Sequence, residues 1–292
     1  MIVIIITGPT ASGKSAIAIE VAEALGCEII SADSRQIYRQ MPITTAVPSS
    51  ADLERVRHHL IECLEPEDYY SAARFEEDAL RLIADMESRG LQYCVVCGGS
   101  MMYIDALTRG LDELPTISDD VRESTLQFFQ EHGIEAVRQE LQRLDPQYYE
   151  QADLDNHRRL VHALEIIRQS GRPVSELRTG KSKERPFEIK KFAVHRERDV
   201  LFERINSRVD QMIATGMEAE AKALLPKRHL NSLNTVGFKE MFAMFDGVMD
   251  RTTAIERLKK NTRVYAKKQL TWLKRDDDVR YITSASDILN SL

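Results

Sequence analysis

Hydrophobic positions change their spacing along the chain, and the first hundred residues carry three short apolar runs that each lead into a turn. These runs lie at 2–7, 27–31 and 91–97. Apolar positions at helical spacing fill much of the chain between them, most clearly over 71–87. Strand–helix units in succession predict an α/β fold with a parallel sheet and right-handed crossovers.

The stretch 42–62 contains two prolines and then an apolar pattern, which predicts a loop followed by a helix over 53–61. His58 and His59 fall in that helix. Adjacent positions diverge by about 100° around a helix, so two such histidines seldom bind one metal ion. Solvent-exposed or hydrogen-bonding roles are therefore the favoured interpretation.

Only helical patterns occur between 116 and 178, with breaks at Gly133, at Pro146 and at 171–173. This predicts an all-helical insertion domain (116–178) in a core formed by 1–115 and 179–292. The core resumes with an alternating strand at 188–194 and a helix at 201–213. A glycine-broken connection at 235–240, a long helix over 254–275 and an edge strand at 279–282 complete the predicted elements.

Composition places the chain among ordinary globular proteins. It has 292 residues, of which 43% are hydrophobic and 29% charged. No apolar run approaches the roughly 20 residues of a membrane span, and the apolar start is too short for a signal peptide. We therefore expect a cytoplasmic protein without a membrane partner. Of its four cysteines, Cys94 and Cys97 flank two valines, which favours buried thiols over a redox or metal pair.

Charge is distributed unevenly. The net charge of −6 argues against indiscriminate nucleic-acid binding, yet 257–275 is strongly basic. Lys260, Arg263, Lys267 and Lys274 share one face of the predicted terminal helix. Most basic helices are simply solvated, but this density favours contact with a phosphate backbone.

The turn after the first strand fits the pattern G-x-x-x-x-G-K-[ST] in full. It consists of Gly8, Pro9, Thr10, Ala11, Ser12, Gly13, Lys14 and Ser15. Gly8 and Gly13 allow dihedrals that turn N–H groups toward an anion, and the following helix adds its positive end. Lys14 supplies a mobile charge, and the Ser15 hydroxyl is placed to bind Mg²⁺. The pattern predicts a phosphorylated ligand; on its own it is also typical of ATP-binding and other nucleotide-binding proteins.

Asp33 follows the second strand, at the edge where open parallel sheets carry their chemistry. A catalytic carboxylate and an N-cap for the next helix are both open interpretations. Arg158 and Arg159 begin an amphipathic helix of the insertion. A solvated surface is the favoured interpretation there, and phosphate contact is the alternative.

Taken together, the motifs resemble the tRNA dimethylallyltransferase family, also called tRNA isopentenyl transferases. The matching segments are 8–15, 31–39, 58–61, 98–103, 163–166, 236–240 and 262–272. They occur in the family's order and span nearly the whole chain. The phosphate loop is generic, whereas 33–36 together with the carboxyl-terminal block is specific.

The resemblance implies a P-loop NTPase-like core and a prenyl transfer reaction. A dimethylallyl group would pass from its diphosphate to the exocyclic N6 amine of the adenosine 3′-adjacent to the anticodon, in tRNAs reading codons that begin with U. The loop 8–15 and Mg²⁺ would hold the diphosphate leaving group, and Asp33 would act as general base. Thr10 and Arg208 match family positions near the reacting groups and the diphosphate.

The resemblance also implies a binding surface for the tRNA anticodon stem-loop. Asp33, Ser34, Arg35, Gln36 and Ser100 would read the extruded base, and Arg158, Arg159 and Lys267 would hold the RNA backbone. We expect a monomer.

Several positions depart from the family's usual residues. Thr44 stands where Gly is usual, Val47 lies near a usual Lys, Ser100 replaces Thr, and His162 replaces a common Arg. These departures leave the details of tRNA contact and the substrate range open.

Three alternative functions compete with this interpretation. An enzyme that prenylates free adenine nucleotides would not use the insertion or the basic helix. A small-molecule kinase would need a second magnesium-binding Asp after a hydrophobic strand, which we do not find. A non-catalytic nucleotide switch or RNA-binding module would not need a base at Asp33.

Overall fold

The computed structural model describes residues 1–112 and 114–292 and divides into two compact units. The first comprises Met1–Thr108 and Arg185–Leu292, and the second is Arg109–Glu184. The predicted insertion at 116–178 falls inside the second unit, whose bounds are wider. Among the described residues, no helix is both long and apolar enough to cross a membrane.

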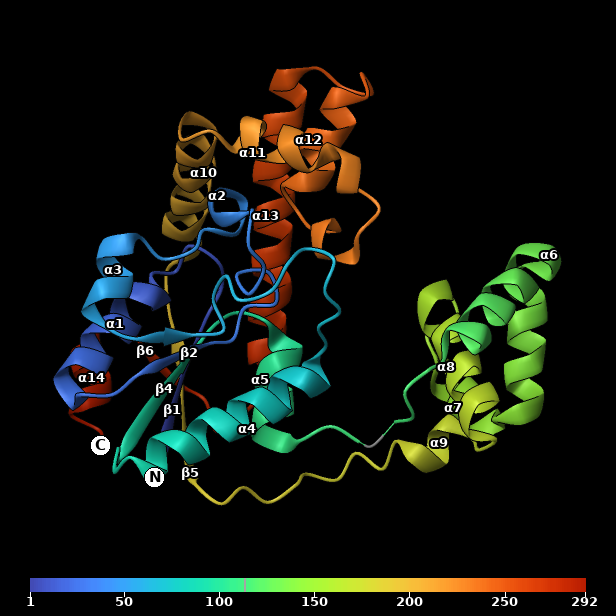
Figure 1. The fold of residues 1–292 in the computed structure, drawn as a ribbon, viewed down its shortest axis with the longest axis horizontal. Helices are drawn as coiled ribbons and strands as arrows, with labels where there is room; N and C mark the ends of the chain where they lie inside the picture. The colour runs from blue at the N-terminus through green and yellow to red at the C-terminus, as the bar shows by residue number, and fades with distance from the viewer. Residues whose placement is uncertain (113) are drawn as a thin grey trace. The chain divides into compact units, whose positions relative to one another are not determined.

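The first unit is built on a parallel sheet (Figure 1). Within the described residues its strand order is β3-β2-β4-β1-β5-β6. The strands are β1 (Ile2–Thr7), β2 (Ile29–Ser31), β3 (His58–His59), β4 (Tyr93–Cys97), β5 (Glu188–Val194) and β6 (Arg280–Ile282). The predicted α/β class is confirmed, and β6 forms an edge of the sheet as predicted at 279–282.

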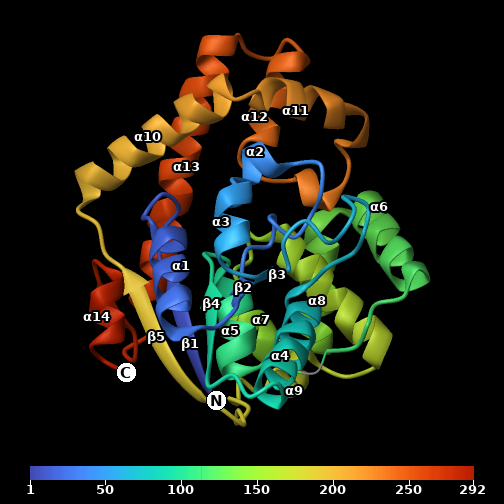
Figure 2. The same ribbon diagram turned by 60° about the vertical axis from the view of Figure 1, so that its left-hand side comes forward.

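Helices cover both faces of this sheet and extend beyond it (Figure 2). They are α1 (Lys14–Leu25), α2 (Pro42–Thr45), α3 (Ser50–Arg55), α4 (Ala72–Ser88), α5 (Met101–Arg109), α10 (Arg198–Ala214), α11 (Met217–Leu224), α12 (Phe238–Phe245), α13 (Arg251–Leu273) and α14 (Ala285–Leu289), with 3-10 turns at Leu225–Lys227 and Asn231–Leu233. Successive residues of β1 face opposite sides, because side chains alternate along a strand. Ile4 therefore packs with α1 and α14, and Ile5 packs with α4 and α5.

The predicted helix over 53–61 is wrong in its second half. Helix α3 ends at Arg55, the backbone is extended at Val56 (φ −138°, ψ 137°), and His58–His59 forms β3. His58 pairs with Ile29 of β2, so β3 becomes an edge of the sheet. Burying the Val56 side chain and completing ladder hydrogen bonds to β2 outweigh the local helical pattern.

A third core lies among the helices that follow β5 in the sequence. Phe238, Met241 and Leu258 are fully buried or nearly so in this cluster. Ile37 and Met41 from the segment after β2 are buried in the same cluster. This packing brings α10–α13 against the polar segment that begins at Asp33, and thereby forms a site at the carboxyl ends of the strands.

The second unit is helical throughout its described regular structure, as predicted. It contains α6 (Asp119–Leu144), α7 (Pro146–Gln151), α8 (His157–Ser170) and α9 (Val174–Leu177). The breaks fall where the sequence placed them: Gly133 is non-helical with φ +75°, Pro146 begins α7, and Gly171 ends α8 with φ +68°. Val137, Leu141, Leu160 and Leu164 belong to the separate core of this unit.

Candidate active site

The phosphate loop occupies the turn between β1 and α1. Gly8 has φ +149° and Gly13 has φ +94°, both in a region that side-chain-bearing residues rarely adopt. A Cβ on Gly8 would lie 3.0 Å from Ser12 Oγ and 3.3 Å from the Val194 carbonyl oxygen. Glycine is therefore required at Gly8 both by conformation and by close packing against β5.

Two arginines hold the outside of this loop. Arg204 Nε donates to the Ala11 carbonyl oxygen at 2.8 Å, and Arg196 Nε donates to the Ser12 carbonyl oxygen at 3.1 Å. These bonds fix two carbonyl groups of the loop and place positive charge beside it. The loop motif gives no signal for either arginine.

Lys14 and Ser15, the last residues of the motif, open α1 and line the site cavity. Burial lowers the pKa of the Lys14 ammonium below its ordinary value, and the negative charge of Asp33 opposes that shift. Ser15 is exposed on the first turn of the helix. A cationic side chain and a hydroxyl thus lie beside the anion-binding backbone of the loop.

Asp33 follows β2 and combines the two roles left open by the sequence. Its Oδ1 accepts hydrogen bonds from the backbone N–H groups of Arg35 (2.9 Å) and Gln36 (3.3 Å). The carboxylate therefore caps a turn, although no helix begins there before Pro42. Within the described residues no hydrogen bond involves Oδ2. One oxygen stabilises the backbone, and the other remains available for a ligand.

The glycine turn after β4 packs directly against the segment containing Asp33. A Cβ on Gly98 would lie 2.1 Å from the Ala32 carbonyl oxygen, so no side chain fits there. The Ser100 Oγ accepts a hydrogen bond from the Ser34 N–H at 2.8 Å. Ser100 thereby stabilises the backbone next to Asp33, a structural role that the resemblance did not imply.

Helices α10 and α13 complete the charged centre. Burial lowers the pKa of the Arg208 guanidinium, and Asp33 again opposes the shift. Burial also raises the pKa of Tyr265 to about 12 and that of Cys97 to about 11, with a further increase from Asp33 in each case. Tyr265 and Cys97 line the site cavity, which the sequence analysis did not predict: it placed Tyr265 in the segment 262–272 without a role and interpreted Cys97 as a buried thiol.

These groups line one cavity of about 670 Å³ in the first unit. The predicted site residues among its walls are Thr10, Lys14, Ser15, Asp33, Ser34, Arg35, Gln36, Ser100 and Arg208. Apolar walls also contribute, among them Val47, Val209, Met212 and Met217. The cavity thus offers both an anion-binding end with a carboxylate and an apolar surface.

Gln36 is bonded to the end of α2 at the cavity wall. The Gln36 side-chain amide donates to the carbonyl oxygens of Thr45 and Ala46, and its oxygen accepts from Ser31 Oγ. Thr44 donates its N–H to Glu220 Oε1 at 2.8 Å and lines the cavity, as does Val47. Of the four departures from the family pattern, Thr44, Val47 and Ser100 therefore lie in the wall of the cavity itself.

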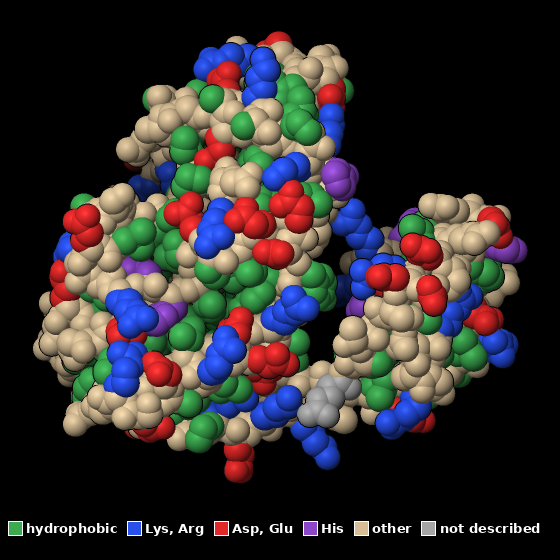
Figure 3. All heavy atoms as spheres, in the orientation of Figure 1, with side chains coloured by type: hydrophobic (Ala, Val, Ile, Leu, Met, Phe, Trp, Pro, Cys, Tyr) green, Lys and Arg blue, Asp and Glu red, His purple; other side chains and the backbone are tan. Residues whose placement is uncertain are grey.

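The predicted backbone-binding residues lie outside this cavity. Lys267 is exposed on α13, with Nζ 5.7 Å from the centroid of the Phe202 ring. Arg263, on the same predicted basic face, donates to Asn206 Oδ1 at 2.5 Å, so part of that face packs against α10. Arg158 and Arg159 are exposed at the start of α8 in the second unit. Figure 3 shows Lys and Arg side chains interspersed with Asp and Glu over the visible face.

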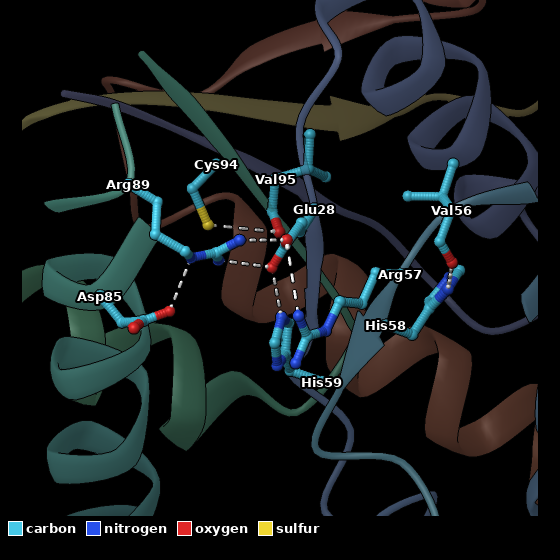
Figure 4. A network of polar contacts seen from close by, with 9 residues as sticks. All are labelled: Glu28, Val56, Arg57, His58, His59, Asp85, Arg89, Cys94 and Val95. Atoms are coloured by element: carbon cyan, nitrogen blue, oxygen red, sulfur yellow. Dashed lines mark hydrogen bonds and ion pairs between the residues drawn. The ribbon is translucent and has the colours of Figure 1, made fainter. Parts of the chain in front are cut away.

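The paired histidines have hydrogen-bonding roles, as favoured from the sequence (Figure 4). His58 Nδ1 lies 2.8 Å from the Val56 carbonyl oxygen, and His59 Nε2 lies 2.7 Å from Glu28 Oε2. Among the described residues no group of three or more His, Cys, Asp or Glu is arranged to hold a metal ion. Cys94 and Cys97 are buried and free, which confirms the prediction of core thiols.

Comparison with known proteins gives consistent matches over nearly the whole chain. A family model described as IPP transferase matches residues 36–276. The chain is 45% identical over 278 residues to tRNA dimethylallyltransferase 2 of Parabacteroides distasonis, covering 95% of this chain and 93% of that protein. It is 44% identical over 278 residues to tRNA dimethylallyltransferase 1 of Bacteroides thetaiotaomicron, covering 95% and 90%.

Solved structures give a similar result. The crystal structure of a full-length tRNA isopentenylpyrophosphate transferase from Bacillus halodurans matches with a TM-score of 0.70 and 35% identity, covering 96% of this chain and 89% of that one. A eukaryotic dimethylallyltransferase acting on tRNA matches with a TM-score of 0.82 and 25% identity, covering 98% and 74%.

Proposed function

The chain belongs to the IPP transferase family, and from that premise we propose the reaction, its substrates and the roles of its residues. The enzyme transfers a dimethylallyl group from dimethylallyl diphosphate to the exocyclic N6 amine of the adenosine 3′-adjacent to the anticodon. Its substrates are tRNAs that read codons beginning with U. The observation that carries this proposal is that Lys14, Arg208 and Asp33 line one cavity.

The diphosphate binds at the phosphate loop. Loop N–H groups, Lys14 and Arg208 offset its negative charge, which grows on the leaving oxygen as the allylic carbon–oxygen bond breaks. Thr10 lines the same cavity. The apolar wall containing Val209, Met212 and Met217 suits the dimethylallyl group, which has no polar atom to satisfy.

Asp33 acts as the general base. The adenosine amine attacks the allylic carbon, a nitrogen–carbon bond forms, and diphosphate departs with the electrons of the broken carbon–oxygen bond. The amine proton passes to the Asp33 carboxylate. The Asp33 Oδ2, which no described residue hydrogen-bonds, supports this role, while Oδ1 keeps the turn in place.

The residues of the site fit Mg²⁺ shared with the diphosphate. Mg²⁺ usually keeps several waters and takes only one or two protein ligands when substrate phosphates are present. The exposed Ser15 hydroxyl, on the first turn of α1 beside Lys14, meets that need and would hold the ion. When bound, Mg²⁺ supplies positive charge to the leaving diphosphate.

The tRNA contacts follow from the exposed and cavity-lining polar groups. Arg35, Ser34 and Gln36 line the cavity beside Asp33 and would contact the extruded base. Arg158 and Arg159, exposed and without acidic partners among the described residues, would bind backbone phosphates together with Lys267. The enzyme acts in the cytoplasm as a monomer, which size-exclusion chromatography with light scattering would check.

A side-by-side transfer assay tests the proposal. Labelled dimethylallyl diphosphate and Mg²⁺ are offered with unmodified tRNA containing the target adenosine, with the same tRNA carrying guanosine there, or with free AMP. Label is expected in the first substrate alone. Label in AMP would identify a free-nucleotide prenyltransferase. No transfer together with tight binding or hydrolysis of ATP would overturn the proposal in favour of a nucleotide-binding protein.

A further inference from the structure

One buried side chain joins two loops that line the cavity. Gln269 lies on α13 and is 3% exposed. Its Oε1 accepts a hydrogen bond from the Thr10 N–H at 2.9 Å, and its Nε2 donates to the Gly99 carbonyl oxygen at 2.9 Å. A single amide therefore holds the phosphate loop and the turn that leads into α5.

The absence of a side chain at Gly99 follows from this close packing. A Cβ built there would lie 2.3 Å from Gln269 Nε2 and 3.4 Å from the Gly8 carbonyl oxygen. The Gly99 backbone does not have a left-handed φ, so conformation alone does not demand glycine. Close approach of the Gln269 amide does, because a separation of 2.3 Å would force it to move.

Both residues held by Gln269 lead directly to the proposed reaction centre. Thr10 lines the cavity, and its N–H is already used by Gln269, so the side-chain hydroxyl is the group it can offer to a ligand. Gly99 precedes Ser100, whose Oγ binds the Ser34 N–H beside Asp33. A displacement of Gln269 would therefore shift the loop that holds the leaving group relative to the base.

We propose that Gln269 is a positioning residue for prenyl transfer, an inference that rests on the proposed function. Its amide fixes the phosphate loop relative to the segment containing Asp33, so that the allylic carbon and the attacking amine are held in reacting geometry. It acts through Thr10 and Ser100. Because misplacement by about 1 Å can cost about a hundredfold in rate, removing this link affects turnover more than binding.

The test compares Gln269→Glu and Gln269→Leu with the control Gln211→Leu, which changes an exposed glutamine of α10. The Glu variant keeps an acceptor for the Thr10 N–H but has no donor for Gly99. Single-turnover transfer is expected to fall about 10- to 100-fold in both Gln269 variants. The tRNA dissociation constant is expected to stay within about twofold, and the control is expected to match the wild type.

A double-mutant cycle keeps the test valid even if one single variant folds poorly, because it compares the effect of Gly99→Ala in two backgrounds. Gly99→Ala should slow transfer strongly in the wild type, but much less in a Gln269→Ala background, where the amide it would strike is gone. Additive effects would overturn the proposal. The proposal would also be overturned if the Gln269 variants melt at a lower temperature but keep the wild-type transfer rate, counted per protein molecule that still binds tRNA. If the wild-type protein itself transfers no label, the proposed function fails instead.

Discussion

At the scale of single residues, Asp33 uses Oδ1 to hold a turn and leaves Oδ2 for its proposed role as general base. Because Oδ1 caps the turn at Arg35 and Gln36, an Asn in its place can still accept those hydrogen bonds while losing basicity. Asp33→Asn is expected to slow transfer by about 10²- to 10⁴-fold with the melting temperature nearly unchanged. Rapid-quench transfer assays and thermal melts would measure the two effects.

Asp33→Ala is the matched comparison, because it removes the turn cap as well as the base. It should slow transfer as much as Asp33→Asn and be less stable than that variant, while tRNA binding is largely retained. Transfer by Asp33→Asn within about tenfold of the wild type would contradict the general-base role.

Gly98 is required by space alone. A Cβ there would lie 2.1 Å from the Ala32 carbonyl oxygen, a backbone atom that cannot rotate away. Gly98→Ala is expected to reduce the free energy of unfolding by about 3 kcal/mol or more, measured by urea denaturation.

Gly26→Ala provides the control for the Gly98 prediction. Gly26 has φ +61°, but a Cβ there would meet no atom within 4 Å, so only backbone strain of about 1–2 kcal/mol applies. Equal destabilisation of the two variants would contradict the prediction, because it would show that the backbone after β4 shifts to make room for the new Cβ at residue 98.

At the scale of elements, Glu28 fastens the edge strand β3 to the rest of the sheet. Arg89 of the turn after α4 donates to both Glu28 oxygens, at 2.7 and 2.9 Å, and His59 of β3 contacts Oε2 (Figure 4). The hydrogen bonds from Arg89, followed by those from His59, lower the pKa of Glu28 to about 2. The bonds from Glu28 to two side chains thus help to hold β3, a two-residue edge strand that few ladder hydrogen bonds attach to the sheet.

This network predicts a specific acid dependence of stability. Because the pKa of Glu28 is depressed from 4.5 to about 2, its contribution is full above pH 4.5 and is lost as the pH falls toward 2. After allowance for solvent screening, the full contribution is about 2 kcal/mol. The stability difference between wild type and Glu28→Gln, measured by urea denaturation, should therefore shrink as the pH is lowered from about 5 to about 3.

The control for that series is Glu23→Gln, which removes an ion pair with Arg55 on an exposed surface. The bond to Arg55 lowers the pKa of Glu23, but exposed pairs contribute little to stability, so this variant should depart from the wild-type pH profile much less than Glu28→Gln. If the difference in unfolding free energy between wild type and Glu28→Gln stays constant across the pH range, the network stabilises the fold through packing and not through the Glu28 charge.

Helix α13 shows how one element serves two purposes. Ala266, Gln269 and Leu273 are buried, and Gln269 reaches both loops of the site. Lys267 and Lys268 are exposed on the same helix. Of the predicted basic face, Lys260, Lys267 and Lys274 are exposed and Arg263 packs against α10. Gln269, the residue proposed to position the reaction, lies on the buried side of α13.

At the scale of the whole molecule, the two units have separate hydrophobic cores. The chain has a net charge of −6 and carries both acidic and basic residues. We therefore expect RNA binding to depend on local arginines and not on net charge. Changing both Arg158 and Arg159 to Gln is expected to weaken tRNA binding and to lower the slope of log Kd against log salt by roughly 1 for each phosphate no longer bound. Transfer at saturating tRNA should persist.

Filter binding at several salt concentrations would measure this effect. Arg172→Gln is the control, because Arg172 is exposed in the same unit but already ion-paired with Glu176. An unchanged salt slope in the double variant, or an equal change in the control, would remove Arg158 and Arg159 from the proposed RNA-binding surface.

The sequence alone determined those structural features that depend on residues close together in the chain. The succession of short apolar runs and helical patterns predicted the parallel sheet, the glycine and proline breaks predicted the turns of the second unit, and the pattern 8–15 predicted the phosphate loop. Dihedral preferences and side-chain periodicity act over a few residues, so these features can be recognised before the chain folds.

The tertiary structure decided how distant segments meet. Gln269 contacts Thr10 across 259 positions, Arg204 contacts Ala11 across 193, and the short pair His58–His59 becomes a strand only because β2 lies beside it. The partners of a buried side chain depend on which helices pack over the sheet, and no local pattern encodes that choice. For this reason the sequence identified the residues of the loop, and only the packing of α10 and α13 against it showed what holds the loop in place.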